Sequence, residues 1–360
     1  MKACLKVSLE DIKFNWKSLN NYSNGKAAAV IKANAYGMGM LKVAGALLDA
    51  GCNYFYLANI NEGIKLRKKY NFNKIFIAIF EGYFEGYQKT YKEYNLIPVI
   101  NSLEQLERLN NYVLEENIPK AILNIDTGMN RLGLNQKETH FLIKNKDILN
   151  NIRWDYIMSH LANAEDKENP NNSIQLNKIK KISKNFPNIK ISLANTGGIK
   201  LGKEFCLDQT RPGIGLYGID SFGKNLDLFS KLLQLPIKLI APIIQIKNVK
   251  RGEKISYGGI DILNKDSILA TIGIGYADGF LRLLKPNGIF SIGNEKCKIV
   301  GNITMDSFVL DITNLKKIKL KEGDFISVLN NSNIENMLSS SDIISYELLT
   351  LMGDRLLRVY

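Results

Sequence analysis

The chain has 360 residues, of which 45% are hydrophobic and 23% charged, and its formal net charge is +13. These fractions are typical of a globular protein, and the length allows two domains with a large core. The positive charge invites a nucleic-acid-binding interpretation. However, the lysines are spread along helix-like stretches such as 178–184, without a finger or RNP-like motif. We therefore expect a solvated basic surface.

The cysteines exclude two further classes of site. Cys4, Cys52, Cys206 and Cys297 are far apart in sequence and form no C-x-x-C pair, and the chain has only two histidines. A Cys/His zinc site is therefore not expected, and reduced thiols favour a cytoplasmic protein. The first residues lack the apolar core of a signal peptide, and no run approaches membrane-spanning length. We expect a soluble, cytoplasmic protein.

In the first two-thirds of the chain, short apolar runs alternate with longer helical patterns. A capping-box-like start at Ser8 announces an early helix, and leucines recur at helical spacing over 102–117. Eight strand–helix units predict a parallel sheet that closes into a (β/α)8 barrel. An open doubly wound sheet is the alternative, but no G-x-G-x-x-G follows any of the first seven strands. The predicted strands are 27–33, 54–60, 74–80, 96–101, 121–126, 156–161, 189–195 and about 205–211.

The pattern changes near residue 230. From Ile237 onward, β-rich runs are separated by Gly, Asn and Asp turns, and helical periodicity returns only at 342–351. This indicates a second, mainly β domain. We expect the barrel over 8–230 and the β domain over 231–360, with 1–7 as a further candidate member of the second domain.

Lys32 follows the apolar, strand-like run 27–31, where water is scarce. Burial penalises an ammonium, and a neutral amine is what Schiff-base chemistry with an aldehyde cofactor requires. The alternative is a lysine that extends into solvent at a strand end. Chemistry in βα barrels lies at the carboxyl ends of the strands, where several polar residues fall here. They are Lys32, Tyr36, Asp126, Arg131, His160, Asn195, Thr196 and Arg211.

Eight short segments, in order along the chain, indicate a particular protein family. They are VIKANAYGMG (30–39), DTGMNRLG (126–133), SHLA (159–162), ANT (194–196), RPGIGLYG (211–218), SYG (256–258), GYADG (275–279) and MD (305–306). Together they closely resemble the motifs of alanine racemases, which are fold-type III enzymes that use pyridoxal 5'-phosphate (PLP). The resemblance runs over both expected domains.

The resemblance implies a cofactor site at the barrel mouth. Lys32 would hold PLP covalently and serve as one of two bases. Arg211 would face the pyridine nitrogen. Because arginine has no acceptor, it can only donate to an unprotonated nitrogen, which weakens the ring as an electron sink and favours reprotonation over transamination. The further cofactor-binding residues implied are Tyr36, His160, Asn195, Thr196 and the backbone at Gly213 and Ile214.

The resemblance also implies a shared active site in an obligatory homodimer. Tyr257 would be the second base, supplied by the partner subunit and helped by positive charge from a His160–Arg211 pair. Without the resemblance, Tyr257 is only an aromatic residue in a turn. Arg131 and the N–H of Met305 would bind the carboxylate of a small amino-acid substrate. The entrance and surrounding residues implied are Tyr276, Arg282, Asp306 and Asn124.

The chain departs from the family pattern at Asn124, at Met38 in place of the usual histidine, at Thr196 where serine is common, and near the C-terminus. Asn124 stands where many members carry a carbamylated lysine that positions the carboxylate-binding arginine. We hypothesise that Asn124 donates to a small anion such as chloride, which then holds Arg131. The phosphate-side tyrosine common near the C-terminus is absent from 352–355.

Three functions remain as alternatives. The favoured one is racemisation of L- and D-alanine for peptidoglycan. The second is a broad-specificity, serine or lysine racemase on the same scaffold. The third, a non-catalytic PLP-binding protein, resembles the barrel alone and is disfavoured by the β domain with Tyr257 and Met305. A fold-type III decarboxylase is also disfavoured, because its glycine-rich phosphate loop is not evident.

Overall fold

The computed structural model describes residues 2–70, 74–115, 120–219, 232–284, 289–292, 295–315, 319–330, 334 and 344–360. The chain forms two compact units. The barrel unit comprises Glu10–Ala35 and Gly39–Gln234, and the β unit comprises the chain up to Leu9, Tyr36–Met38 and Leu235–Tyr360. The expected boundary between residues 230 and 231 lies outside the described residues.

The barrel unit is built on parallel strands that pair in chain order from β2 to β8. Most of their residues are buried, as expected for strands covered on both faces. The strands are β2 (Ala29–Val30), β3 (Tyr54–Leu57), β4 (Phe76–Ile79), β5 (Ile97–Ile100), β6 (Ala121–Asn124), β7 (Trp154–Met158) and β8 (Lys190–Ser192).

The ring closes through the segment predicted as an eighth strand. Gln209 bridges to Ser192 of β8, and Thr210 bridges to Ala27 just before β2, both in parallel orientation. The strand is short because the 3-10 turn Lys203–Phe205 overlaps the start of the predicted range, and only Gln209 and Thr210 form bridges. The (β/α)8 prediction is thus confirmed, with its last strand reduced to two bridges.

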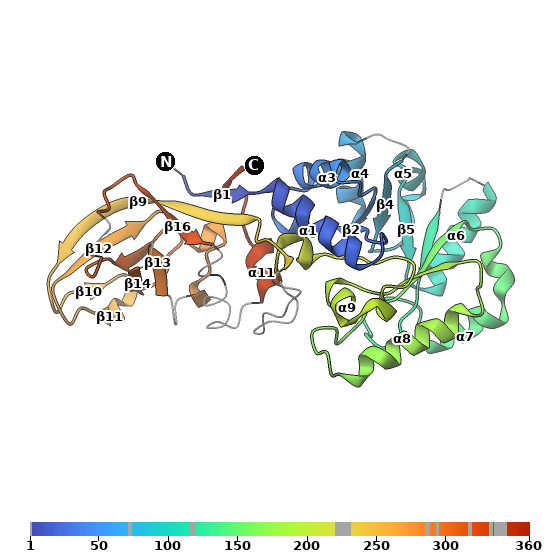
Figure 1. Ribbon diagram of the computed structural model, residues 1–360. Helices are drawn as coiled ribbons and strands as arrows, with labels where there is room; N and C mark the ends of the chain where they lie inside the picture. The colour runs from blue at the N-terminus through green and yellow to red at the C-terminus, as the bar shows by residue number, and fades with distance from the viewer. Residues whose placement is uncertain are drawn as a thin grey trace. The chain divides into compact units, whose positions relative to one another are not determined.

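Helices surround these strands on the outside (Figure 1). Helix α7 begins with a capping box between Asn135 and Glu138, and α8 begins with Asn169 as its cap and Pro170 at its first turn. The predicted helix over 102–117 is α6. The helices are α1 (Leu9–Tyr22), α2 (Lys32–Tyr36), α3 (Met40–Asp49), α4 (Ile60–Lys69), α5 (Gln88–Glu93), α6 (Leu103–Glu115), α7 (Gln136–Lys144), α8 (Pro170–Ser183) and α9 (Thr196–Leu201).

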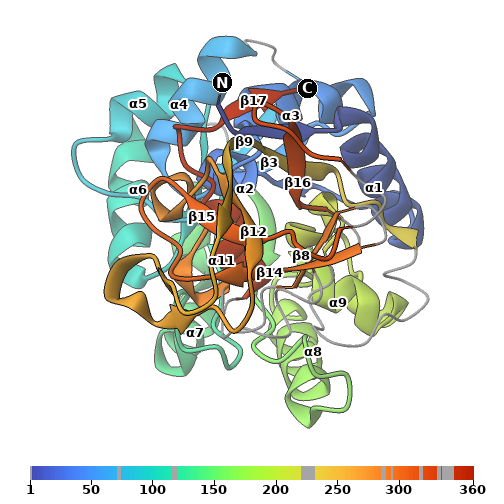
Figure 2. The same ribbon diagram turned by 90° about the vertical axis from the view of Figure 1, so that its left-hand side faces the viewer.

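The main sheet of the β unit has the order β13-β14-β15-β12-β9-β1-β17, with β16 also paired to β9. Figure 2 looks onto it, with β9, β12 and β15 near the viewer. The two ends of the chain meet in this sheet, because β1 pairs with both β9 and β17. The elements are β1 (Cys4–Val7), β9 (Ile237–Val249), β12 (Ser267–Ile272), β13 (Ile289–Ile292), β14 (Glu295–Val300), β15 (Phe308–Asp311), β16 (Phe325–Leu329), β17 (Leu357–Val359), the hairpin β10 (Lys254–Ile255) with β11 (Asp261–Ile262), and helix α11 (Ser345–Thr350).

Three aromatic residues form the centre of the β unit. Phe308 stacks on Phe280 with ring centres 4.9 Å apart, and Phe290 lies 5.4 Å from Phe308. All three side chains are buried. Such close aromatic packing stabilises the sheet beyond the area that it buries.

Among the residues that the structure describes, none of the helices combines the length and apolar character needed to cross a membrane.

Candidate active site

The strand that leads to Lys32 is shorter than predicted. It was expected over 27–33, but β2 ends at Val30, and α2 then turns with left-handed backbone. Four consecutive non-glycine residues, Ala33 to Tyr36, have φ between 52° and 55°. Each such residue costs about 1–2 kcal/mol, so left-handed runs of this length are rare. Lys32 therefore lies between the end of the barrel strand and a strained turn, whose conformation must be stabilised by other contacts.

The amine of Lys32 lies in an environment that disfavours its charge. Burial lowers its pKa, the positive charge of Arg131 lowers it further, and the carboxylate of Glu62 opposes the shift. Its Nζ lies 5.7 Å from the centre of the Phe80 ring. Lowering the pKa of a lysine increases the fraction of its amine that is neutral, and the neutral amine is the nucleophile.

Arg211 is buried inside the barrel, with only 2% of its surface exposed. Its Nη1 donates to Ser192 Oγ at 2.5 Å, and its Nη2 donates to the carbonyl of Ser159 at 2.6 Å. Burial lowers its pKa to about 10, so the guanidinium remains charged at neutral pH. Its Nε is buried and finds no acceptor among the described residues. A buried donor without a partner is costly, so this N–H is suited to an acceptor on a bound ligand.

His160, which follows β7, is neutral. Burial lowers its pKa to about 3, and the charges of Arg211, Arg131 and Lys32 add to the shift. The expected positive charge of a His160–Arg211 pair therefore resides on Arg211 alone. The carbonyl of His160 accepts a hydrogen bond from Gln175 Nε2 at 2.9 Å, which fixes the backbone at this strand end.

Thr196 links two short helical turns at the barrel mouth. Its Oγ1 accepts from the N–H of Gly213 at 3.1 Å and from that of Gly215 at 3.2 Å. A Cβ on Gly215 would come within 2.7 Å of Thr196 Cγ2, so glycine permits this approach. Ile214 begins the 3-10 turn 214–217. The Thr196 hydroxyl keeps its own hydrogen for donation, so this cluster, with the adjoining backbone of Ile214, is suited to an anion.

Asn195 is the N-cap of α9, a role that was not predicted from the sequence. Its Oδ1 accepts from the N–H of Gly198 at 2.8 Å, which caps the first turn of α9. A contact between Asn195 and a cofactor stays a prediction.

Tyr36 ends the left-handed turn and is buried. Burial raises the pKa of its hydroxyl, so the phenol remains a neutral donor. Its ring centre lies 6.2 Å from that of Tyr346 in α11. Tyr346 lies N-terminal to 352–355, where the family pattern placed a tyrosine, and was not predicted from the sequence.

Arg131 lies in the loop between β6 and α7 and is exposed. Asp126 shapes this loop, because one of its carboxylate oxygens accepts two backbone N–H groups at 2.8 and 2.9 Å. Asn124 is buried, and its Nδ2 donates to Asn101 Oδ1 at 2.8 Å. One N–H of the Asn124 amide is thus engaged and the other remains for a further acceptor. The anion hypothesis stays a prediction.

Tyr257 and Met305 belong to the β unit. Tyr257 is 78% exposed in the short turn 257–259, and Asn302 Nδ2 donates to its carbonyl at 3.0 Å. Met305 and Tyr276 are 52% and 41% exposed. The N–H of Ala277 donates to the carbonyl of Met305 at 3.1 Å, which joins their two loops. Large exposed side chains of this kind are candidates for contact with another molecule.

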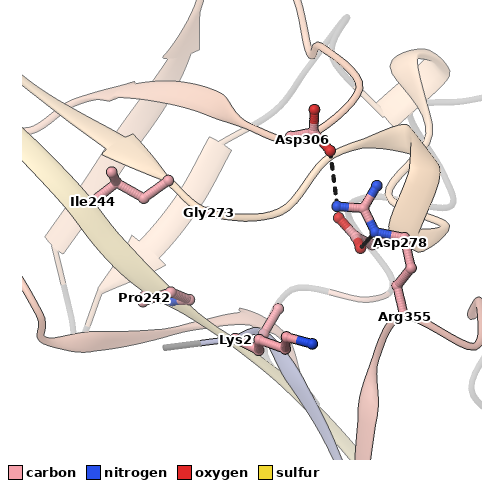
Figure 3. Close-up of a pocket in the computed structure, with 8 residues that line it drawn as sticks. Lys2, Pro242, Ile244, Gly273, Asp278, Asp306 and Arg355 are labelled. Carbon is pink, nitrogen blue, oxygen red and sulfur yellow. Dashed lines mark hydrogen bonds and ion pairs between the residues drawn. The ribbon is translucent and has the colours of Figure 1, made fainter.

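Asp306 lines a pocket of the β unit together with Arg355 and Asp278 (Figure 3). Arg355 binds both carboxylates: its Nη2 lies 2.8 Å from Asp306 Oδ1 and its Nε lies 3.2 Å from Asp278 Oδ1. Asp278 also accepts the N–H of Gly275 at 3.0 Å. Arg355 therefore ties together the loops that carry Met305 and Tyr276. Arg282 is exposed in the turn 282–284.

Several buried polar residues that support the site were not predicted. Ser192 holds Arg211, and its hydroxyl also donates to the carbonyl of Gln209 at 3.0 Å. Tyr56 donates to Gln209 Oε1 at 2.5 Å, and its ring centre lies 5.9 Å from Arg211 Cζ. Ser192 could have been noticed as a small polar residue within the predicted strand 189–195. Tyr56 has the pattern of an ordinary core aromatic residue.

Comparison with known proteins agrees with this geometry. The family model described as "Alanine racemase, N-terminal domain" matches residues 7–221, and "Alanine racemase, C-terminal domain" matches residues 237–360. The chain belongs to the alanine racemase family. The resemblance seen in the motifs is thus confirmed over nearly the whole length.

Individual alanine racemases are similar over most of the chain. The alanine racemase of Rickettsia bellii is 40% identical over 334 residues, covering 92% of this chain and 80% of that protein. That of Rickettsia typhi is 35% identical over 401 residues and all of both chains. The crystal structure of alanine racemase from Bartonella henselae with covalently bound pyridoxal phosphate has a TM-score of 0.94 at 35% identity, covering 100% of this chain and 99% of that one.

Proposed function

We propose that this chain is an alanine racemase, a PLP-dependent isomerase that interconverts L- and D-alanine and supplies D-alanine for peptidoglycan. Family membership over the whole chain supports the activity. At the level of residues, the proposal rests on the buried Arg211 guanidinium, whose Nε–H finds no acceptor among the described residues. Arg211 belongs to the same ring of strand ends as Lys32.

The residues at the barrel mouth fit PLP. Lys32 would hold its aldehyde carbon, and Arg211 Nε–H would donate to its pyridine nitrogen. Thr196 with the backbone of Gly213 and Ile214 would bind its phosphate, since the Thr196 hydroxyl already accepts two N–H groups and keeps its own proton for donation. When bound, PLP acidifies the Cα–H of alanine by withdrawing electrons.

The protein supplies a base for each face of the substrate. Lys32 would take or return the proton on one face, because its lowered pKa increases the neutral fraction of the amine. Tyr257 would do the same on the other face. Arg131 and the N–H of Met305 would bind the substrate carboxylate, with Tyr276, Arg282 and Asp306 around the entrance.

Tyr257 would reach the reaction from the partner subunit of a homodimer. Its 78% exposure supports this, because an aromatic side chain so exposed in one chain is available to another. The reaction would take place in the cytoplasm, which the four buried, unpaired cysteine thiols support.

A substrate panel with chiral product analysis tests the proposal. We expect racemisation of alanine well above that of serine and lysine. Tyr257→Phe should slow the racemisation of alanine. Lys32→Ala should lose the visible absorbance of protein-bound PLP. Faster turnover of serine or lysine would move the assignment to the alternative racemase, and unchanged visible absorbance in Lys32→Ala would refute the anchor.

A further inference from the structure

A carboxylate outside the predicted site holds the turn that follows Lys32. Glu62 in the first turn of α4 is half-buried, and its Oε1 accepts the N–H of Asn34 at 3.2 Å. Its Oε2 accepts the N–H of Ala58 at 3.0 Å. One side chain therefore joins the left-handed turn to the loop between β3 and α4.

The turn needs such restraint because its conformation is unfavourable. At about 1–2 kcal/mol for each left-handed residue, the segment Ala33 to Tyr36 would relax toward ordinary backbone if it were free. Asn34 lies in the middle of this segment. Glu62 fixes its N–H, while the Asn34 side chain accepts the N–H of Met40 at 2.9 Å. The turn is thus held at Asn34 from both sides.

We propose that Glu62 is a positioning residue for Lys32, which fixes the left-handed turn and thereby the direction in which the Lys32 amine leaves the strand. This inference rests on the proposed function. A charged hydrogen bond to a backbone N–H is among the stronger kinds, and the bidentate use of one carboxylate sets the geometry of both segments.

Glu62 also acts on the charge of the Lys32 amine. Of the groups that act on this amine, Arg131 lowers its pKa and Glu62 raises it. His160, on which the charges of Arg211, Arg131 and Lys32 act, is itself neutral. Removal of the Glu62 charge should therefore lower the pKa of Lys32 further. A residue that served only to cap α4 would not produce this shift.

Glu62→Gln is the test, with Glu81→Gln as its matched control. An amide has one acceptor oxygen and an NH2 group, so the new side chain in Glu62→Gln would face one of the two N–H groups with a donor. Glu81 is also half-buried, and its Oε1 accepts the N–H of Ile60 at 2.7 Å at the start of the same helix. Glu81→Gln weakens a comparable bond without touching the turn.

Two measurements on the full-length chain decide the proposal. Competitive acetylation after removal of PLP, read at Lys32 by mass spectrometry, should give a lower pH midpoint in Glu62→Gln than in wild type or Glu81→Gln. In the PLP-loaded enzyme, kcat for alanine should fall by about ten- to a hundredfold in Glu62→Gln, as expected for a misplaced catalytic group. The fall in Glu81→Gln should be much smaller.

Equal midpoints and equal kcat values in Glu62→Gln and Glu81→Gln would overturn the proposal. If Glu62→Gln does not fold, Glu62→Asp keeps the charge but is one methylene shorter. It should leave the midpoint near the wild-type value and still lower kcat, and wild-type kcat in it would overturn the proposal. A wild-type chain that does not racemise alanine, but whose Lys32 midpoint still falls in Glu62→Gln, would refute the proposed function while supporting the positioning role.

Discussion

The anchoring of Arg211 by Ser192 gives a quantitative prediction. Ser192 is fully buried and accepts from Arg211 Nη1 at 2.5 Å. A hydrogen bond to a charged group contributes about 1.5–3 kcal/mol. In Ser192→Ala the carbonyl of Gln209 also loses its donor, which adds roughly 1 kcal/mol. The free energy of unfolding of the barrel unit should therefore fall by about 3 kcal/mol, and racemisation should slow because the guanidinium is no longer held.

Urea unfolding followed by tryptophan fluorescence is the assay. Both tryptophans of the chain, Trp16 and Trp154, lie in the barrel unit, so their emission reports its unfolding. Ser183→Ala is the matched control, because Ser183 is buried and donates only to the Lys180 carbonyl of its own helix. If Ser192→Ala unfolds at the same urea concentration as Ser183→Ala, the reasoning about Arg211 is refuted.

Three further variants test separate parts of the site. Thr196→Val keeps the volume but removes the acceptor for Gly213, and PLP should dissociate about tenfold faster. His160→Asn should flatten the pH dependence of stability: the folded-state pKa of His160 is lowered from 6.5 to about 3, so wild type loses stability as pH falls below 6.5. Arg355→Gln should raise KM for alanine more than it lowers kcat, whereas Lys250→Gln, in an exposed ion pair of the same unit, should change neither.

One outcome for each variant would contradict these predictions. Equal PLP dissociation rates in Thr196→Val and wild type, measured by loss of visible absorbance, would remove Thr196 from the phosphate site. Parallel stability curves between pH 4 and 7, measured by urea unfolding for His160→Asn and wild type, would show that the histidine protonates freely. An unchanged KM in Arg355→Gln would show that its ion pairs do not position the substrate loops.

The barrel could be predicted because its strands are buried on both faces. Continuous apolar runs such as Tyr54–Leu57 and Ile97–Ile100 encode that burial locally. The left-handed turn could not be predicted, because Ala33, Ala35 and Tyr36 disfavour positive φ and a contact that holds the turn comes from Glu62, distant in sequence. The eighth strand was predicted too long, because the 3-10 turn Lys203–Phe205 overlaps its start and only Gln209 and Thr210 form bridges.

The residues of the site could likewise be predicted from the sequence only in part. Lys32 and Arg211 could be found from their positions at strand ends, but the bonds that hold Arg211 join residues from two other strands. Tyr346 was missed because its partner Tyr36 lies at the other end of the sequence. No local sequence pattern around Tyr257 predicts a function, and only the family resemblance indicated its role.

Mixing two inactive variants tests the central claim most directly. Lys32→Ala lacks one base and Tyr257→Phe lacks the other, so each homodimer should have little activity. If Tyr257 is supplied by the partner, each mixed dimer has one intact site, and random reassortment should restore about a quarter of the wild-type rate of alanine racemisation. A mixture that stays as inactive as its two components would contradict the account.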